Sequence, residues 1–172
     1  MAAALATLNR YKSTVLIDAG LLLTLYLLPA ISHTVAFPLY KFEPMRIALI
    51  IALLFTSRAN TYFIAFTIPL ASAFVTGHPE LFKAILMGIE LSALVAIYSY
   101  LVRRDRLPAF AALIAAILLS KLLYYGLKSA ALGAGFLSGQ LISTPVTSQL
   151  ILAIGTAIIF GVVEHFRSGK HP

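Results

Sequence analysis

Residues 112–127 read ALIAAILLSKLLYYGL, and this stretch decides the fold class of the chain. Its apolar residues are continuous and do not alternate with polar ones, as the strands of a membrane β-barrel would require. In lipid, such a run satisfies its backbone hydrogen bonds only as an α-helix. Residues 16–31 read LIDAGLLLTLYLLPAI and have the same character. The sequence therefore predicts an all-α, polytopic membrane protein.

The overall composition supports lipid as the solvent of this chain. Of its 172 residues, 60% are hydrophobic and only 11% are charged, and the mean hydropathy is +0.95. A water-soluble domain of this size needs more polar residues to cover its outside. The net charge of +7 comes from basic residues that lie mainly at the ends of apolar runs. Membrane topology and anionic headgroups account for that placement, so membrane lipids are expected partners and nucleic acid is not.

The apolar runs predict a bundle of about six transmembrane helices in a single domain. They cover residues 13–36, 45–56, 59–75, 81–102, 107–127 and 146–166. The second run would extend only about 18 Å, whereas the hydrocarbon core is about 30 Å thick. It must gain length from residues 38–44, tilt, or be shielded by neighbouring helices. The third run contains Pro69, which removes a backbone donor and predicts a kink.

The distribution of basic residues predicts the orientation in the cell inner (plasma) membrane. Six crossings place eight basic residues in the cytoplasm: Arg10, Lys12, Arg58, Arg103, Arg104, Arg106, Arg167 and Lys170. The other side then holds Lys41, Arg46, Lys83, Lys121 and Lys128. This bias follows the positive-inside rule and places both termini in the cytoplasm. Without the second span, the basic turn at 103–106 would lie outside, so the charge pattern supports keeping it.

Among the charged residues within the apolar runs, Glu90, Lys121 and Arg46 are candidate functional residues. Glu90 and Lys121 each cost roughly 2.5 to 3.5 kcal/mol in lipid, so they are expected to face protein. They either pair as a structural ion pair between their helices or line a pocket that binds polar groups of a ligand. Arg46 sits inside an already short run and needs a partner or a ligand. Glu43, just before it, either takes part in the same site or caps the helix that Pro44 opens.

Two helical faces are predicted to form a cleft. Lys83 and Met87 share a face with Glu90, and a second stripe runs along the next helix. The second stripe contains Lys121, Tyr124, Tyr125 and Lys128. A half-apolar, half-charged cleft of this kind suits a small molecule with a flat ring and anionic or hydrogen-bonding groups. The alternative places the tyrosines and Lys128 in an interfacial belt, and for Lys128 and Tyr125 it is the preferred interpretation.

Small residues at four-residue spacing form a ridge on the last helix, namely Ala153, Ala157 and Gly161. Helices in lipid associate through such ridges, because small side chains let the backbones approach closely. Most ridges pack within their own bundle, but one on a terminal helix can instead receive a partner subunit.

Several catalytic motifs are absent from the sequence. It contains no GxxxxGK[ST] phosphate loop, no HExxH and no GxSxG elbow, and it has no cysteine. The chain is therefore not expected to be an enzyme or to bind a metal or cofactor, and any ATP-driven engine would be another chain.

A family resemblance covers about a third of the chain. It is carried by TGHPELFKAILMGIEL at 76–91, the RRDR turn at 103–106 and LPAFAALIAAILLSKLLYYG at 107–126. These motifs resemble the substrate-binding S components of energy-coupling factor (ECF) transporters, which similarly show a Gly-x-Pro turn and a Met-x-x-Glu-Leu helix. The resemblance implies a six-helix subunit that captures a vitamin or micronutrient from outside. A transmembrane coupling protein and a pair of ATPases would complete the importer.

The resemblance also implies site residues. The pocket would be formed by Lys41, Glu43, Arg46, His78, Lys83, Glu90, Lys121 and Tyr124. The family's Ala-x-x-x-Ala coupling motif belongs in the first helix, whereas here the nearest example is Ala2 with Ala6, ahead of the apolar run. Either that helix extends towards the N-terminus, or coupling relies on the ridge of the last helix, or the chain works without the partner.

Two other functions compete with solute capture. One is a non-transporting membrane scaffold resembling the rod-shape proteins, which have a similar size and number of spans. The other is an intramembrane enzyme using Glu90 or the histidines, against which the lack of a clustered nucleophile or metal set argues.

Overall fold

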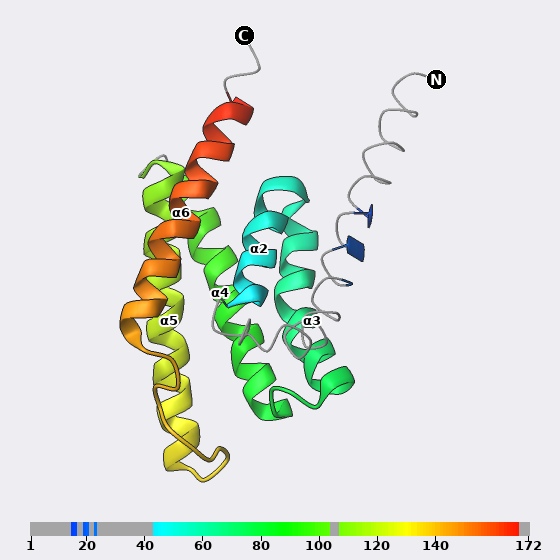
Figure 1. The fold of residues 1–172 in the computed structure, drawn as a ribbon, viewed down its shortest axis with the longest axis vertical. Helices are drawn as coiled ribbons and strands as arrows, with labels where there is room; N and C mark the ends of the chain where they lie inside the picture. The colour runs from blue at the N-terminus through cyan, green and yellow to red at the C-terminus, as the bar shows by residue number, and fades with distance from the viewer. Residues whose placement is uncertain (1–14, 17–18, 21–22, 24–42, 104–106, 169–172) are drawn as a thin grey trace.

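A computed structural model describes residues 15–16, 19–20, 23, 43–103 and 107–168. Within this part of the chain the elements are α2 (Pro44–Phe55), α3 (Arg58–Thr76), α4 (Leu81–Arg103), α5 (Ala109–Gly133) and α6 (Val146–Ser168) (Figure 1). Most of the predicted span 13–36 lies outside the described residues. So do three predicted site or partner residues, Lys41, Ala2 and Ala6.

Three of the described helices are long and apolar enough to cross a membrane, namely Leu81–Arg103, Ala109–Gly133 and Val146–Arg167. Their outer faces carry large apolar side chains that the bundle does not cover. On α5 and α6 these are Leu118, Leu119, Leu122, Leu123, Ile151, Ile154, Ile158 and Ile159. Such faces need lipid as their solvent. The predicted all-α, multi-pass membrane chain is confirmed at this level, whereas the count of six spans stays a prediction.

Helix α5 is longer than the apolar run predicted. It continues to Gly133, beyond the predicted end at Leu127, because the residues after Lys128 are small or apolar helix formers. The helix ends where Gly135 adopts a left-handed conformation with φ 76. There the Phe136 amide donates to the carbonyl of Ala131 at 2.9 Å, as in a Schellman-type end. The connection to α6 is therefore residues 134–145.

The short helix α2 is shielded by its neighbours. Pro44 occupies its first turn, and the backbone amides of Arg46 and Ile47 donate to the carbonyl of Glu43 at 2.9 and 3.2 Å. The helix packs against α3, α4 and α6, and half of its 12 residues are buried. At its other end, Arg167 of α6 donates to the carbonyl of Leu54. Shielding by neighbours, one of the three arrangements predicted for a run this short, is therefore observed.

Helix α3 packs beside α4, and the turn between the two helices lies at one end of the bundle. The side chain of Ser57 caps its start by accepting from the Asn60 amide at 3.3 Å. The helix continues through Pro69 and ends at Gly77, whose φ of 72 favours glycine. Residues 77–80 then connect it to α4. We call the end of the bundle that holds residues 77–80 and 134–145 the loop end; it lies at the bottom of Figure 1.

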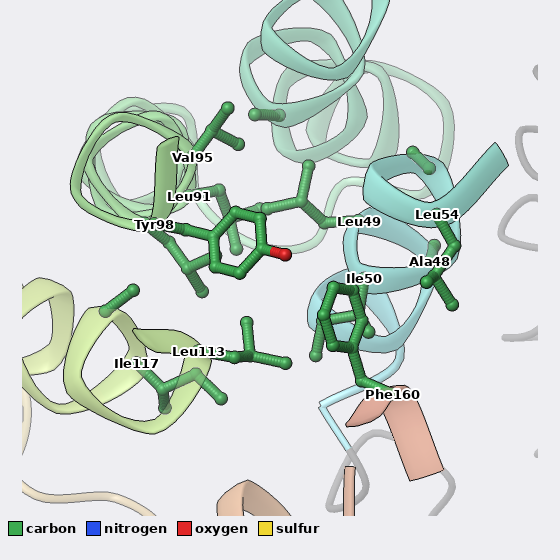
Figure 2. Close-up of a cluster of buried hydrophobic side chains, with 14 of the residues drawn as sticks. Ala48, Leu49, Ile50, Leu54, Leu91, Val95, Tyr98, Leu113, Ile117 and Phe160 are labelled. Carbon is green, nitrogen blue, oxygen red and sulfur yellow. The ribbon is translucent and has the colours of Figure 1, made fainter. Parts of the chain in front are cut away.

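The apolar core lies where all five described helices converge, with Ile64, Ala65 and Ile68 contributed by α3. Figure 2 shows Leu49 of α2 facing Tyr98 of α4, with Leu113 of α5 and Phe160 of α6 beside them. The rings of Tyr98 and Phe160 meet edge to face, with centroids 5.4 Å apart. This core fills the half of the bundle away from the loop end, so polar side chains are left to meet nearer its middle.

Candidate functional site

Four charged residues from three helices meet inside the bundle. Glu43 and Arg46 lie at the start of α2, Glu90 lies near the middle of α4, and Lys121 lies near the middle of α5. They can meet because α2 begins level with the middles of the two long helices (Figure 1). We call these four residues the charge network.

Each carboxylate of the charge network contacts both cations. Arg46 donates from Nη1 to Glu43 Oε2 and from Nη2 to Glu90 Oε1, the second at 2.5 Å. Lys121 Nζ lies 2.7 Å from Glu43 Oε1 and 3.8 Å from Glu90 Oε1. The predicted contact between Glu90 and Lys121 therefore exists, but it is the longest of the four. The closer contacts run through Arg46 and Glu43.

The charge network is buried to different depths. The side chains of Arg46 and Glu90 are each 6% exposed, whereas those of Lys121 and Glu43 are 17% and 18% exposed. Two carboxylates balance two cations, so no net side-chain charge is left within the network. Removing one member would leave an unpaired buried charge, which typically costs about 3–5 kcal/mol. The partner that the sequence required for Arg46 is thus supplied twice.

Glu43 has an unusual backbone conformation. Its φ of 51 and ψ of 53 are left-handed, a region that costs a residue with a Cβ about 1–2 kcal/mol. Glu43 is the N-cap residue of α2, as one of the two interpretations predicted, but its side chain makes no capping hydrogen bond to the helix. The carboxylate instead reaches Arg46 and Lys121. Strain of this kind clusters at functional sites.

Tyr124 extends the charge network towards the loop end. It is buried, and its ring centroid lies 6.0 Å from Lys121 Nζ and 6.0 Å from Lys128 Nζ. The ring thus lies within cation–π range of both ammonium groups. The predicted stripe along α5 is therefore a continuous feature of the structure.

Lys128 is turned inward, towards the 134–145 loop, and its predicted position in an interfacial belt stays a prediction. It is only 4% exposed, and its Nζ donates to the carbonyls of Gln140 and Leu141, both at 2.8 Å. Two backbone dipoles thus hold the Lys128 ammonium, and no carboxylate of the described residues lies at hydrogen-bond distance from it. We call Lys128 with these two carbonyls the loop anchor.

The rest of the 134–145 loop is also tied to the helices. Gln149 donates to the carbonyl of Thr144 at 2.8 Å, and its side chain hydrogen-bonds the Tyr125 hydroxyl. Phe136 stacks on Phe82 of α4, with ring centroids 5.5 Å apart. Sequence reasoning missed Gln149, because one amide in an apolar run gives no signal of its partner. The loop therefore covers the ends of α4 and α5.

Two predicted pocket residues lie nearer the loop end than the charge network. Lys83 is partly buried in the first turn of α4, and its positive charge repels that of Lys128. His78 is exposed in the turn between α3 and α4, and its carbonyl accepts from the Ser72 hydroxyl at 2.7 Å. The structure thus joins Glu43, Arg46, Glu90, Lys121 and Tyr124 into one site and places Lys83 and His78 towards the loop end.

The small-residue ridge of α6 packs within the chain. Ala153 and Ala157 are 3% and 0% exposed, and they belong to the apolar core. A Cβ at Gly161 would lie 3.1 Å from Cβ of Phe110 on α5. The predicted partner-binding role of Ala153, Ala157 and Gly161 thus does not match this arrangement, because the chain's own helices occupy the ridge. The alternative, packing within the bundle, is the one observed.

These features define the class of protein as a multi-pass helical membrane protein with a charged site inside its bundle. Comparison with protein-family models, curated proteins and solved structures finds no match. The function is therefore argued from the site itself.

Proposed function

We propose that this chain is the substrate-capturing membrane subunit of an ECF-type importer of a vitamin or related micronutrient. It binds a small solute from the outer side of the membrane. Separate ATPase subunits drive the import through a transmembrane coupling protein, since the sequence carries no phosphate loop of its own.

The charge network is the observation that carries this proposal. Four ionisable side chains from α2, α4 and α5 converge near the middle of helices that a membrane surrounds. Ionisable residues at that depth are expensive, and they commonly mark substrate or ion pathways. The half-length α2 adds support, because helices that begin at mid-depth are a recurring way to build transporter sites.

The loop end supports an outward-facing site. The positive-inside bias assigns the loop end to the outer face and both termini to the cytoplasm. The 134–145 loop lies over the α5 stripe that leads from Lys128 through Tyr124 to Lys121. An aromatic ring between two ammonium groups suits a solute with a flat ring and polar substituents.

Ligand-dependent stabilisation tests the proposal. Protein purified in detergent is heated with each member of a panel of vitamins and cofactors, and native mass spectrometry identifies solutes and subunits that co-purify from its own membrane. A ligand at 100 times its Kd adds about 2.7 kcal/mol of stability. For a chain of this size that raises Tm by about 5–10 °C. The response should disappear in Lys121→Met, which removes a cation of the charge network, and persist in Glu80→Gln, which changes an exposed carboxylate.

The proposal fails if no member of the panel raises Tm and no small solute or ATPase subunit co-purifies. A membrane scaffold is the second candidate, because the charge network is internally balanced and suits a structural tie between helices. Co-purification of cell-wall machinery in place of ATPases would favour that candidate.

A further inference from the structure

The start of α2 has the properties of an anion site. The positive end of a helix dipole lies there, near the middle of the membrane-crossing helices. Arg46 lies in the first turn and is 5% exposed, and its Nε is a buried donor with no hydrogen-bond acceptor in the described structure. In transporters, helix N-termini at this depth face anionic groups of the substrate.

The two carboxylates of the charge network are not equivalent. Glu90 lies within a regular helix and is 6% exposed, so its position is fixed by α4. Glu43 precedes α2, is 18% exposed, and has a strained left-handed backbone. Its two oxygens bridge cations on different helices, Arg46 on α2 and Lys121 on α5. Glu43 is thus the member that rotates away with the least disturbance of the bundle.

We propose that the Glu43 carboxylate stands in the place of an anionic group of the captured solute, and that this group displaces it from Arg46 and Lys121. The inference rests on the proposed function, because it names the chemical class of that solute. A carboxylate or a phosphate group offers two oxygens with the same bridging geometry. Its binding relieves the backbone strain at Glu43 and supplies an acceptor for Arg46 Nε.

The charge balance explains why an anion is selected. Without the Glu43 carboxylate, the cations Arg46 and Lys121 face the single carboxylate of Glu90 and the positive end of α2. The site then carries a net positive charge in a region of low dielectric. A neutral solute can offer acceptor oxygens but no counter-charge, so with it the buried site would keep its net positive charge.

The test is an anion titration of full-length protein in detergent. Wild type, Glu43→Gln and Glu80→Gln are heated with propionate or inorganic phosphate, while chloride keeps the ionic strength constant. Gln removes the competing charge at nearly constant volume, so Glu43→Gln should give a saturable rise in Tm. Its half-saturating anion concentration should be at least ten-fold lower than that of wild type. Glu80→Gln, at an exposed site, should behave as wild type.

Equal or weaker anion binding by Glu43→Gln would overturn the inference, and so would an equal gain in Glu80→Gln. Repeating the titration in phosphatidylcholine nanodiscs with and without phosphatidylglycerol separates a free anion from a lipid headgroup. The shift should survive in pure phosphatidylcholine, and a shift that depends on phosphatidylglycerol would overturn a solute site. If Glu43→Gln does not fold, native mass spectrometry of wild type decides. A co-purified solute without an anionic group would overturn the inference.

This test is independent of the coupling partners. Tighter anion binding by Glu43→Gln without ATPase partners would leave the inference standing and remove the proposed transport function. Co-purified ATPase partners and a bound solute, without tighter anion binding by Glu43→Gln, would support the transport function and overturn the inference.

Discussion

Lys121 and Lys128 lie about two turns apart on α5, and both are withdrawn from lipid, but the structure neutralises them differently. Lys121 meets two carboxylates, at 2.7 and 3.8 Å. Lys128 meets two backbone carbonyls of the 134–145 loop, both at 2.8 Å. The first contact ties three helices together through full charges. The second ties a loop to a helix through two backbone dipoles, and water could take the place of either partner in these hydrogen bonds.

This difference separates a permanent tie from a releasable one. The charge network lies near the middle of the helices, where loss of one partner leaves another charge unpaired. The loop anchor lies near the end of α5, where the freed carbonyls regain solvent. We therefore expect substitutions in the charge network to affect the whole bundle and substitutions at the loop anchor to affect the loop.

The largest effect is expected from exchanging Glu90 and Lys121. In an isolated pair, Glu90→Lys with Lys121→Glu would restore the attraction. Here the exchange places the new lysine beside Arg46 and the new glutamate beside Glu43, so like charges meet at both positions. Breaking a buried ion pair typically costs about 3–5 kcal/mol, and the free energy of unfolding of the double variant should fall by no less than that. Thermal unfolding in detergent measures the loss of stability. A double variant more stable than either single variant would show that Glu90 and Lys121 form an isolated pair.

A smaller loss is expected from Glu90→Gln alone. The amide keeps the volume and one acceptor oxygen but leaves Arg46 with only Glu43 as a counter-charge. The expected loss of stability is about 3 kcal/mol. Glu80→Gln is the matched control, because Glu80 is exposed and its loss should change stability by less than about 0.5 kcal/mol. Equal effects of the two substitutions would show that the charge network does not bind the helices together.

Lys128→Met should act mainly on the loop. Methionine keeps the buried stem of the lysine and removes only the ammonium that holds Gln140 and Leu141. The expected loss is about 1–2 kcal/mol, below that of Lys121→Met, because the loop carbonyls regain water. Limited proteolysis should cut residues 134–145 faster in Lys128→Met than in Lys121→Met. The opposite order of cleavage would contradict the distinction between the two lysines.

The smallest effect is expected from Tyr125→Phe. It removes the hydroxyl that hydrogen-bonds Gln149 and keeps the ring. Two neutral hydrogen bonds, at 2.9 and 2.7 Å, are lost with this hydroxyl. A neutral hydrogen bond contributes about 0.5–1.5 kcal/mol, and two that share one hydroxyl and one amide are not additive, so Tm should fall only slightly. Gln149 keeps its bond to the carbonyl of Thr144, and loop cleavage should therefore rise less than in Lys128→Met. A larger rise would assign the anchoring of the loop to Tyr125.

The sequence predicted the inward-facing charges because their cost in lipid depends only on position along an apolar run. Glu90, Lys121 and Arg46 were singled out on that ground. Glu90 and Arg46 are buried, Lys121 is partly buried, and all three contact one another or Glu43. Their exact pairing was not predictable. It depends on the depth at which α2 begins, and a mainly apolar helix of 12 residues fits several depths.

Other features had no usable signal in the sequence. The spacing of Lys128 in the sequence does not show whether its side chain is exposed or buried. Its burial depends on the course of the 134–145 loop, whose carbonyls accept from it. The end of α5 was placed too early because apolar character falls at Lys128, whereas helix propensity continues to Gly133. The ridge at Ala153 and Ala157 was identified correctly as a packing surface, but its partner is this chain.

The length of α5 has a consequence for the bilayer that holds it. Its 25 residues extend about 38 Å, roughly 8 Å more than a typical hydrocarbon core. Measured from Ala109, that excess begins near Lys128, so the loop anchor lies at the level of the headgroups while the charge network stays deep. A thicker bilayer would draw the anchor into hydrocarbon and a thinner one would leave it in water. Bilayer thickness thus acts on the covering loop and spares the charges beneath it.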